Sequence, residues 1–222
     1  AYASIKKAAA MANDELGMLD QRRKTAIVWA CDRILEGQHR EQFRLDAFQA
    51  GAGTSFNMNV NEVVANLGLE KLGRKRGDYK YLSPNDHVNM AQSTNDTFPT
   101  AINVSALLES HLLDGALRKL VAALGAKGRQ FRQIRKSART HLQDAVPITL
   151  GQEFEAYAEA VERARKELVR RADLLKEVAL GGTAVGTGLN AHPKYSQAAV
   201  KHLSKITALR LKPAPNLIFA VQ

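Results

Sequence analysis

Apolar residues recur along much of the chain at the three- and four-residue spacing that marks one face of a helix. The longest example is the segment 150–180, where Phe154, Val161, Leu168 and Leu175 recur every seven residues with no proline between them. At about 1.5 Å per residue this predicts a helix of roughly 40 Å, whose apolar stripe must pack on other long helices. Further helices are predicted over 2–16, 20–35, 99–113, 116–135 and 196–206, with a bend or break at 114–115.

The pattern contains no strand-rich region, so the expected fold class is mainly α, a bundle of long helices. The chain has 222 residues, of which 45% are hydrophobic and 24% are charged. Such a chain can bury a substantial core, and disorder is not expected.

Polar stretches interrupt the helical pattern, and the densest of them lies within Ser83–Thr100. Hydroxyl and amide side chains crowd together over 92–97, and Pro99 then suits the first turn of a helix. Asp96 or Thr97 is expected to cap that helix. A helix N-terminus that carries Ser, Thr and Asn donors can bind a carboxylate or a phosphate. The alternative interpretation is an ordinary helix cap at the surface.

Two more polar loops precede helices. In the segment 49–70, Gly51 and Gly53 allow unusual backbone angles, and Asn59 with Glu62 resembles a capping box. The second loop, Thr140–Asp144, comes before a Thr149–Gln152 capping box. The loop with Gly51 and Gly53 is not a dinucleotide fingerprint, because the third glycine and a preceding hydrophobic strand are absent, and it is not a P-loop, because no Gly-Lys-Ser/Thr follows.

Together the loops 51–57, 92–95 and 140–144 indicate one site assembled from distant segments. Among them, His141 is the only group that titrates near neutral pH. A fourth polar segment, 181–190, is rich in glycine, and a flexible connector is favoured there over a ligand cradle.

The net charge of +10, from 32 Lys and Arg against 22 Asp and Glu, raises the question of nucleic-acid binding. The basic residues are spread over helical segments with interleaved acids and few aromatics. A solvated basic face is therefore favoured, with attraction of anionic substrates as a second role, and no nucleic-acid partner is expected.

The single cysteine, Cys31, excludes an intrachain disulfide and fits a reducing compartment. No signal-peptide pattern and no apolar stretch of membrane-spanning length occurs in the sequence. A cytoplasmic protein without a membrane partner is expected.

Four long motifs carry a resemblance to a known family, and they stand in the family's order and spacing. They are GAGTSFNMNVNEVVAN, PNDHVNMAQSTNDTFPTA, RTHLQDAVPITLGQEF and GGTAVGTGLN. The chain resembles the fumarase/aspartase superfamily over essentially its whole length. Within it, Thr94 and Leu142 make the aspartate ammonia-lyase branch the better match, whereas Gly181–Gly182 favours the class II fumarases.

The resemblance implies reversible deamination of L-aspartate to fumarate and ammonia, by removal of a β-proton through an aci-carboxylate. It places Ser93 and Thr94 on the β-carboxylate and Thr140 on the α-carboxylate. It places Thr54, Asn95 and His141 on the amino group. It implies no metal and no organic cofactor.

The resemblance also implies a homotetramer whose sites take loops from three subunits. It divides the chain into a mostly helical domain over 1–98 and part of a long-helix domain over 99–222. The family's loop of the form Gly-Ser-Ser-x-Met-Pro-x-Lys-x-Asn, which supplies the base serine, is not in this sequence. A fragment that lacks the catalytic-loop region, and is inactive by itself, is therefore expected. A class II fumarase and a non-catalytic helical assembly module remain as alternatives.

Overall fold

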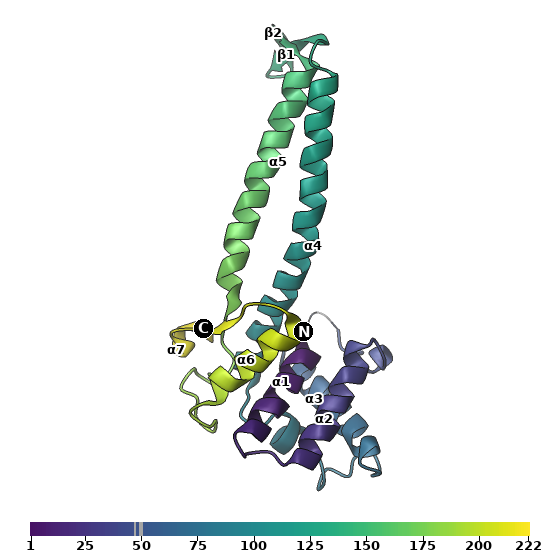
Figure 1. The fold of residues 1–222 in the computed structure, drawn as a ribbon, viewed down its shortest axis with the longest axis vertical. Coiled ribbons are helices and arrows are strands. Elements are labelled where there is room, and N and C mark those ends of the chain that lie inside the picture. Colours follow the sequence, from purple (N-terminus) through teal and green to yellow (C-terminus); the bar gives the residue numbers. More distant parts are fainter. Residues whose placement is uncertain (47, 49–50) are drawn as a thin grey trace. The chain divides into compact units, whose positions relative to one another are not determined.

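The computed structural model describes residues 1–46, 48 and 51–222, so Gln49 and Ala50 of the predicted polar segment lie outside the described residues. The chain forms two compact units (Figure 1). The first consists of Ala1–Ser105 and Leu175–Gln222, and the second is the intervening stretch Ala106–Leu174. Helix α4 (Thr94–Gln130) belongs in sequence to both.

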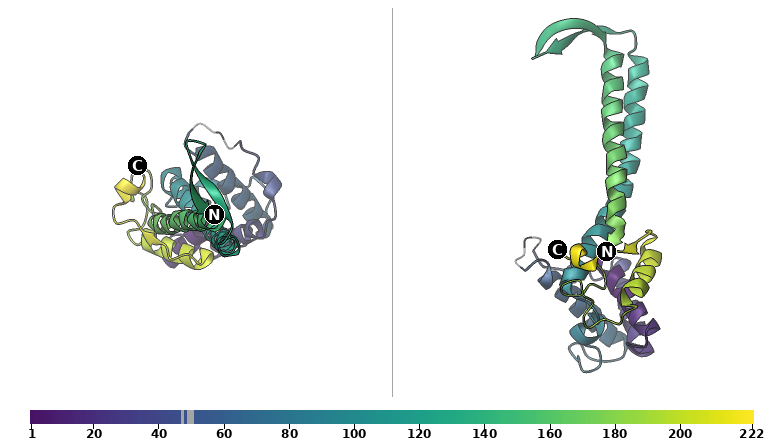
Figure 2. Two further views of the ribbon diagram at one scale, coloured as in Figure 1. Left: turned by 90° about the horizontal axis from the view of Figure 1, so that it is seen from above. Right: turned by 90° about the vertical axis from the view of Figure 1, so that its left-hand side faces the viewer.

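The first unit is a layered packing of short helices. Its elements are α1 (Tyr2–Glu15), α2 (Gln21–Leu35), a 3-10 turn (Arg40–Gln42), α3 (Thr54–Lys71), a π-helical turn (Pro84–Val88), α6 (Tyr195–Thr207) and α7 (Leu217–Ala220). Helix α1 lies against both α2 and α6, although α6 comes near the other end of the sequence (Figure 2). The alanines of α1 permit this close packing, because Ala8, Ala9 and Ala12 are fully buried. Strands β3 (Glu177–Val178) and β4 (Lys212–Pro213) add a short parallel bridge.

The second unit is a pair of long antiparallel helices, α4 and α5 (Leu150–Ala172), joined by a β-hairpin. The two helices approach closely where Gly128 faces Gly151, since a Cβ on Gly151 would lie 2.5 Å from the Gly128 carbonyl oxygen. Phe154 packs edge to face against Phe131 beside this contact. These aromatic and glycine contacts hold the hairpin end of the helix pair together.

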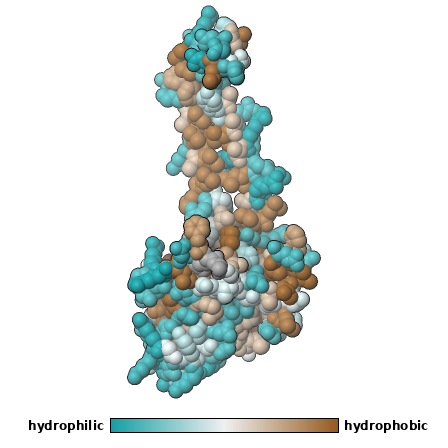
Figure 3. Space-filling model, turned by 180° about the vertical axis from the view of Figure 1, so that it is seen from behind, coloured by the Kyte–Doolittle hydropathy of each residue, from teal (hydrophilic) through white to brown (hydrophobic). Residues whose placement is uncertain are grey.

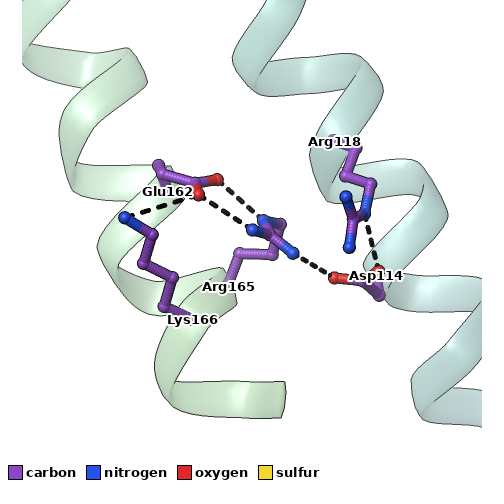
Figure 4. A network of polar contacts seen from close by, with 5 residues as sticks. All are labelled: Asp114, Arg118, Glu162, Arg165 and Lys166. Carbon is purple, nitrogen blue, oxygen red and sulfur yellow. Dashed lines mark hydrogen bonds and ion pairs between the residues drawn. The ribbon is translucent and has the colours of Figure 1, made fainter. Parts of the chain in front are cut away.

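A network of charged side chains links the same two helices further along. Arg165 of α5 donates to Asp114 of α4 at 2.6 Å and to both oxygens of Glu162 at 2.7 and 2.8 Å (Figure 4). Arg118 donates to the other oxygen of Asp114 at 2.8 Å. Because the Arg165 side chain is only 12% exposed, its carboxylate partners stabilise a charge that water reaches poorly.

A β-hairpin joins α4 and α5, which the sequence pattern did not predict, although the fold is mainly α as expected. Strands β1 (Arg135–Thr140) and β2 (Gln143–Thr149) pair antiparallel, with Thr140 opposite Gln143. The two residues between them, His141 and Leu142, both have positive φ, at 47° and 62°, as in a type I′ turn. The sequence did not predict this hairpin because neither turn residue is glycine, asparagine or aspartate, the residues usual in such turns.

The predicted helices are largely confirmed, but several boundaries were wrong. The break at 114–115 does not exist, because α4 continues through Asp114 and Gly115. Helix α5 ends at Ala172 and a 3-10 turn (Asp173–Lys176) follows, whereas the prediction ran to 180. Helix α3 begins at Thr54, so Asn59 lies inside it and no capping box with Glu62 forms. The Thr149–Gln152 capping box is present, with bonds of 2.8 and 3.2 Å.

Apolar side chains remain on the surface of the second unit, where they form a band along the helix pair (Figure 3). Leu112 is 71% exposed, Tyr157 51% and Val169 48%. The helices are nevertheless not of the membrane-spanning kind, since none in the described chain combines the required length with the required hydropathy.

Candidate functional site

A pocket of about 420 Å³ in the first unit gathers three segments that are distant in sequence. They are the start of α3, the turn that leads into α4, and the glycine-rich loop 181–190. Its lining residues are Thr54, Asn57, Met58, Asn89, Ala91, Gln92, Ser93, Thr94, Thr183, Ala184, Val185, Thr187, Leu189 and Asn190. The pocket therefore brings together Thr54, Ser93 and Thr94 of the predicted site.

The N-terminus of α4 opens at this pocket, and its cap differs from the predicted one. Helix α4 begins at Thr94, so the cap position falls on Ser93 rather than on Asp96 or Thr97. The Ser93 hydroxyl oxygen accepts from the Asn95 N–H at 3.2 Å. The Asp96 carboxylate accepts from the Ser93 N–H at 3.0 Å, so the side chain at the third helical position also satisfies the backbone of the cap residue. Pro99 consequently lies inside the helix rather than in its first turn, where it was predicted.

Thr94 and Thr54 occupy the first positions of α4 and α3. Thr94 is 9% exposed, and its Oγ1 accepts from Nδ2 of Asn57 at 3.2 Å. Thr54 donates its hydroxyl to the Gly51 carbonyl at 2.8 Å. The turn before Thr54 requires glycine at position 53, where φ is 85° and a Cβ would lie 2.3 Å from the Phe98 ring.

The glycine-rich loop 181–190 is a wall of the pocket rather than only a connector, which corrects the favoured interpretation of it. Asp96 is fully buried, and it accepts from the backbone N–H groups of Gly181 and Thr183 at 3.0 Å each. Burial raises the pKa of Asp96 to about 6, against the opposing effect of these backbone donors. The loop is thus fixed to the first turn of α4.

Asn95 does not line the pocket, unlike Ser93 and Thr94 beside it. It is exposed, and its Nδ2 donates to the Ala184 carbonyl at 2.7 Å. This bond holds the loop 181–190 beside the start of α4.

Thr140 and His141 belong to the second unit, where both are exposed at the turn of the β1–β2 hairpin. A histidine with positive φ is uncommon, and such backbone angles tend to gather at functional sites. Among the described residues, no three His, Cys, Asp or Glu side chains gather where they could hold a metal ion.

The sequence did not reveal Lys6, which is fully buried behind the pocket. Its Nζ donates to Asn57, Asn89 and Gln92 at 2.8, 3.0 and 2.9 Å. Burial lowers the pKa of Lys6 to about 7, although the nearby Asp96 carboxylate raises it. The one feature of the sequence that could have indicated the burial of Lys6 is its position among the alanines of α1 that face the core.

Comparison with known proteins decides the family. A model of a lyase family matches residues 1–222, the whole chain. The chain belongs to this lyase family. The resemblance in the four sequence motifs is thereby confirmed.

The relatives of this lyase chain are named consistently. It is 52% identical over 221 residues to an aspartate ammonia-lyase of Pseudomonas aeruginosa, covering 99% of the chain and 47% of the relative. It is 51% identical over 222 residues to an aspartate ammonia-lyase of Bacillus subtilis, covering 100% of the chain and 47% of the relative. The lyase chain therefore spans about half the length of the curated relatives it matches.

Solved structures confirm the fold of the lyase chain. A protein from Brucella melitensis, described as fumarate lyase:delta crystallin, is 52% identical with a TM-score of 0.96. The match covers 99% of this chain and 48% of that one. A class II fumarase from Schistosoma mansoni is 37% identical with a TM-score of 0.93, over 99% of this chain and 49% of that one.

Proposed function

We propose that the protein catalyses the reversible deamination of L-aspartate to fumarate and ammonia. One observation supports this most strongly. The hydroxyl-lined pocket at the N-terminus of α4 occurs in a chain that is 52% identical to an aspartate ammonia-lyase. The pocket supplies the hydroxyl and backbone donors that a carboxylate ligand needs.

The chemistry explains why such donors matter. The β-proton of L-aspartate lies beside a carboxylate that is already charged, so its removal builds a doubly charged aci-carboxylate. Donors aimed at the developing charge lower the barrier, and one donor of this kind contributes about 3–4 kcal/mol. We assign this role to Ser93 and Thr94, which hold the β-carboxylate at the positive end of the α4 dipole.

The remaining assignments complete the substrate contacts. Thr54, Asn95 and His141 contact the amino group, and Thr140 contacts the α-carboxylate. We also propose a cytoplasmic homotetramer, in which a neighbouring subunit supplies Thr140 and His141. The exposed apolar band of the helix pair supports this assembly, because such a surface is stabilised when it is covered.

A class II fumarase is the alternative function, supported by the 37% identity and matching fold of the Schistosoma mansoni enzyme. The two activities differ in whether ammonia or water adds to fumarate. A non-catalytic helical assembly role would give neither reaction.

The test uses the full-length natural protein. Formation of fumarate from L-aspartate, and of aspartate from fumarate with ammonia, is the expected result. Thr94→Val should lower kcat/KM about 100-fold or more, because it removes one donor to the developing charge. Ser105→Ala, at an exposed site on the same helix, is the matched control and should leave kcat/KM unchanged. Formation of malate without aspartate would replace the proposal with the fumarase, and no turnover of either substrate would refute both.

A further inference from the structure

Lys6 satisfies all three of its ammonium hydrogens with uncharged side-chain oxygens. The acceptors are Oδ1 of Asn57, Oδ1 of Asn89 and Oε1 of Gln92, at 2.8 to 3.0 Å. All three acceptor residues line the pocket, whereas Lys6 itself is fully buried and does not. A buried ammonium is costly unless it is hydrogen-bonded, and these three hydrogen bonds offset that cost while fixing the orientation of the three amides.

The ammonium determines which way the Asn57 amide faces. A protonated lysine only donates, so in the charged state of Lys6 the oxygen of Asn57 must point toward Lys6 and its Nδ2 away from it. That Nδ2 donates to Thr94 Oγ1 at 3.2 Å. Thr94 Oγ1 therefore accepts a hydrogen bond from the protein. None of the described residues accepts a hydrogen bond from the Thr94 hydroxyl, so its proton is available to a ligand.

We propose that Lys6 is a positioning residue of the pocket, which acts through Asn57 to turn the Thr94 hydroxyl proton toward a carboxylate ligand. The chain of donors runs from Lys6 Nζ to Asn57 Oδ1, and from Asn57 Nδ2 to Thr94 Oγ1. The identity of the ligand rests on the proposed function, whereas the orientation of Thr94 does not.

The electrostatic surroundings agree with this role. The groups facing Lys6 are Tyr2 on its own helix, Cys31 on α2 and Asp96 on α4. Burial places the pKa of Lys6 at about 7 and raises those of Tyr2 and Cys31 to about 12. Over pH 7 to 9, Lys6 is consequently the member of this group that loses its charge.

The test is a double-mutant cycle of Lys6→Met and Thr94→Val in the full-length protein, read out as kcat and KM for L-aspartate. Each single variant should weaken substrate use, with Lys6→Met raising KM about tenfold. In the Thr94→Val background, Lys6→Met should have little further effect, because the group it positions is absent. Additive losses would overturn the proposal. Lys7→Met is the matched control, since Lys7 is the next residue of α1 and pairs with Asp32 instead, and it should not change KM.

The pH profile gives a second readout that a purely structural role would not change. In the wild type, KM should rise as pH increases from about 7 to 9, because Lys6 loses the proton that orients Asn57. In Lys6→Met, KM should be high throughout and should not show this rise. The same rise in both proteins would contradict the proposal.

Asn57→Asp keeps the proposal testable if Lys6→Met does not fold. The carboxylate still accepts from Lys6 but offers Thr94 no donor, so the Thr94 hydroxyl turns inward to donate to it. A tenfold or greater increase in KM is expected in a stably folded protein. The same change in the Thr94→Val background measures the effect of the added negative charge alone. Wild-type KM in Asn57→Asp would overturn the proposal.

A separate measurement distinguishes failure of the proposed enzymatic activity from failure of the positioning role of Lys6. If the wild-type protein turns over neither L-aspartate nor fumarate, the proposed activity is refuted. The positioning role of Lys6 is then tested by NMR, which measures hydrogen exchange of the Asn57 side-chain NH2 group. Slowly exchanging Nδ2 protons in the wild type that become fast in Lys6→Met would support the positioning role. Unchanged exchange would refute it.

Discussion

Asp96 Oδ2 accepts a hydrogen bond from the backbone N–H of Thr183 at 3.0 Å, across 87 positions of sequence. The same oxygen accepts from the Gly181 N–H, and Oδ1 accepts from the Ser93 N–H. One buried carboxylate thus joins the first turn of α4 to the loop 181–190. The pocket wall depends on this carboxylate, so its removal should affect stability and ligand affinity together.

Asp96→Asn tests this dependence. Asparagine has a single acceptor oxygen, so an NH2 group must face at least one buried N–H donor. We expect a loss of about 1–3 kcal/mol in the free energy of unfolding, measured by urea denaturation. Asp86→Asn, at an exposed position, is the control and should change stability little. Equal stability of the two variants would contradict the role given to Asp96.

The glycines of the helix pair give a second prediction. A Cβ on Gly151 would lie 2.5 Å from the Gly128 oxygen and 2.7 Å from the Cα of Arg132, both of them backbone atoms. Gly151→Ala should therefore destabilise the protein by about 1–3 kcal/mol. Gly115→Ala, in open space within α4, should instead stabilise it by about 0.5–1 kcal/mol. Thermal unfolding of both variants measures the contrast, and shifts of the same sign would refute it.

Arg165 gives a third prediction, concerning the charged network of α4 and α5. Arg165→Met removes the donors to Asp114 and Glu162, and leaves both carboxylates without that partner. We expect a lower Tm than for Arg118→Met, whose side chain is 65% exposed. Added salt should reduce the difference between the two variants. An equal Tm for both variants would mean that the partly buried position of Arg165 has no energetic importance.

The buried charges also predict how stability depends on pH. The pKa of Lys6 is about 7 in the folded protein, below its ordinary value of 10.5, so the unfolded chain binds more protons between these values. Stability should therefore rise as pH increases from about 7 to 9. Asp96 has the opposite shift, from 3.8 to about 6, so its contribution rises as pH falls from about 6 to 4. Urea denaturation of the wild type and Lys6→Met between pH 7 and 9 checks the first effect, which the variant should lack.

The helices were predictable because their signals are local. The Thr149–Gln152 capping box and the heptad stripe depend only on spacing along the chain. The structure contains the capping box, and α5 carries the stripe from Phe154 to Leu168, whereas Leu175 lies in the 3-10 turn that follows. The break at 114–115 was wrong because one glycine costs a long helix only about 1 kcal/mol, which packing against α5 offsets. The β-hairpin was missed because its turn, His141–Leu142, uses residues that rarely adopt positive φ.

The pocket was partly predictable for a related reason. Thr54, Ser93 and Thr94 stand in polar segments before helices, which is a local pattern, and the structure gathers them at one pocket. The loop 181–190 and Lys6 required tertiary information. Only the fold brings the loop to Asp96 and buries the lysine next to three amides.

The packing of α1 against α6 has a consequence for synthesis on the ribosome. Helix α1 ends at Glu15, whereas its partner α6 begins at Tyr195. Because the ribosome adds about 5–20 residues per second, the apolar face of α1 lacks its partner α6 for on the order of 10–40 s during synthesis. Before α6 is made, the helix pair 106–174 has been synthesised in full, whereas the first unit still lacks α6. The first unit, which starts first, is therefore expected to finish last, and its exposed alanine face is a candidate for chaperone binding on the nascent chain.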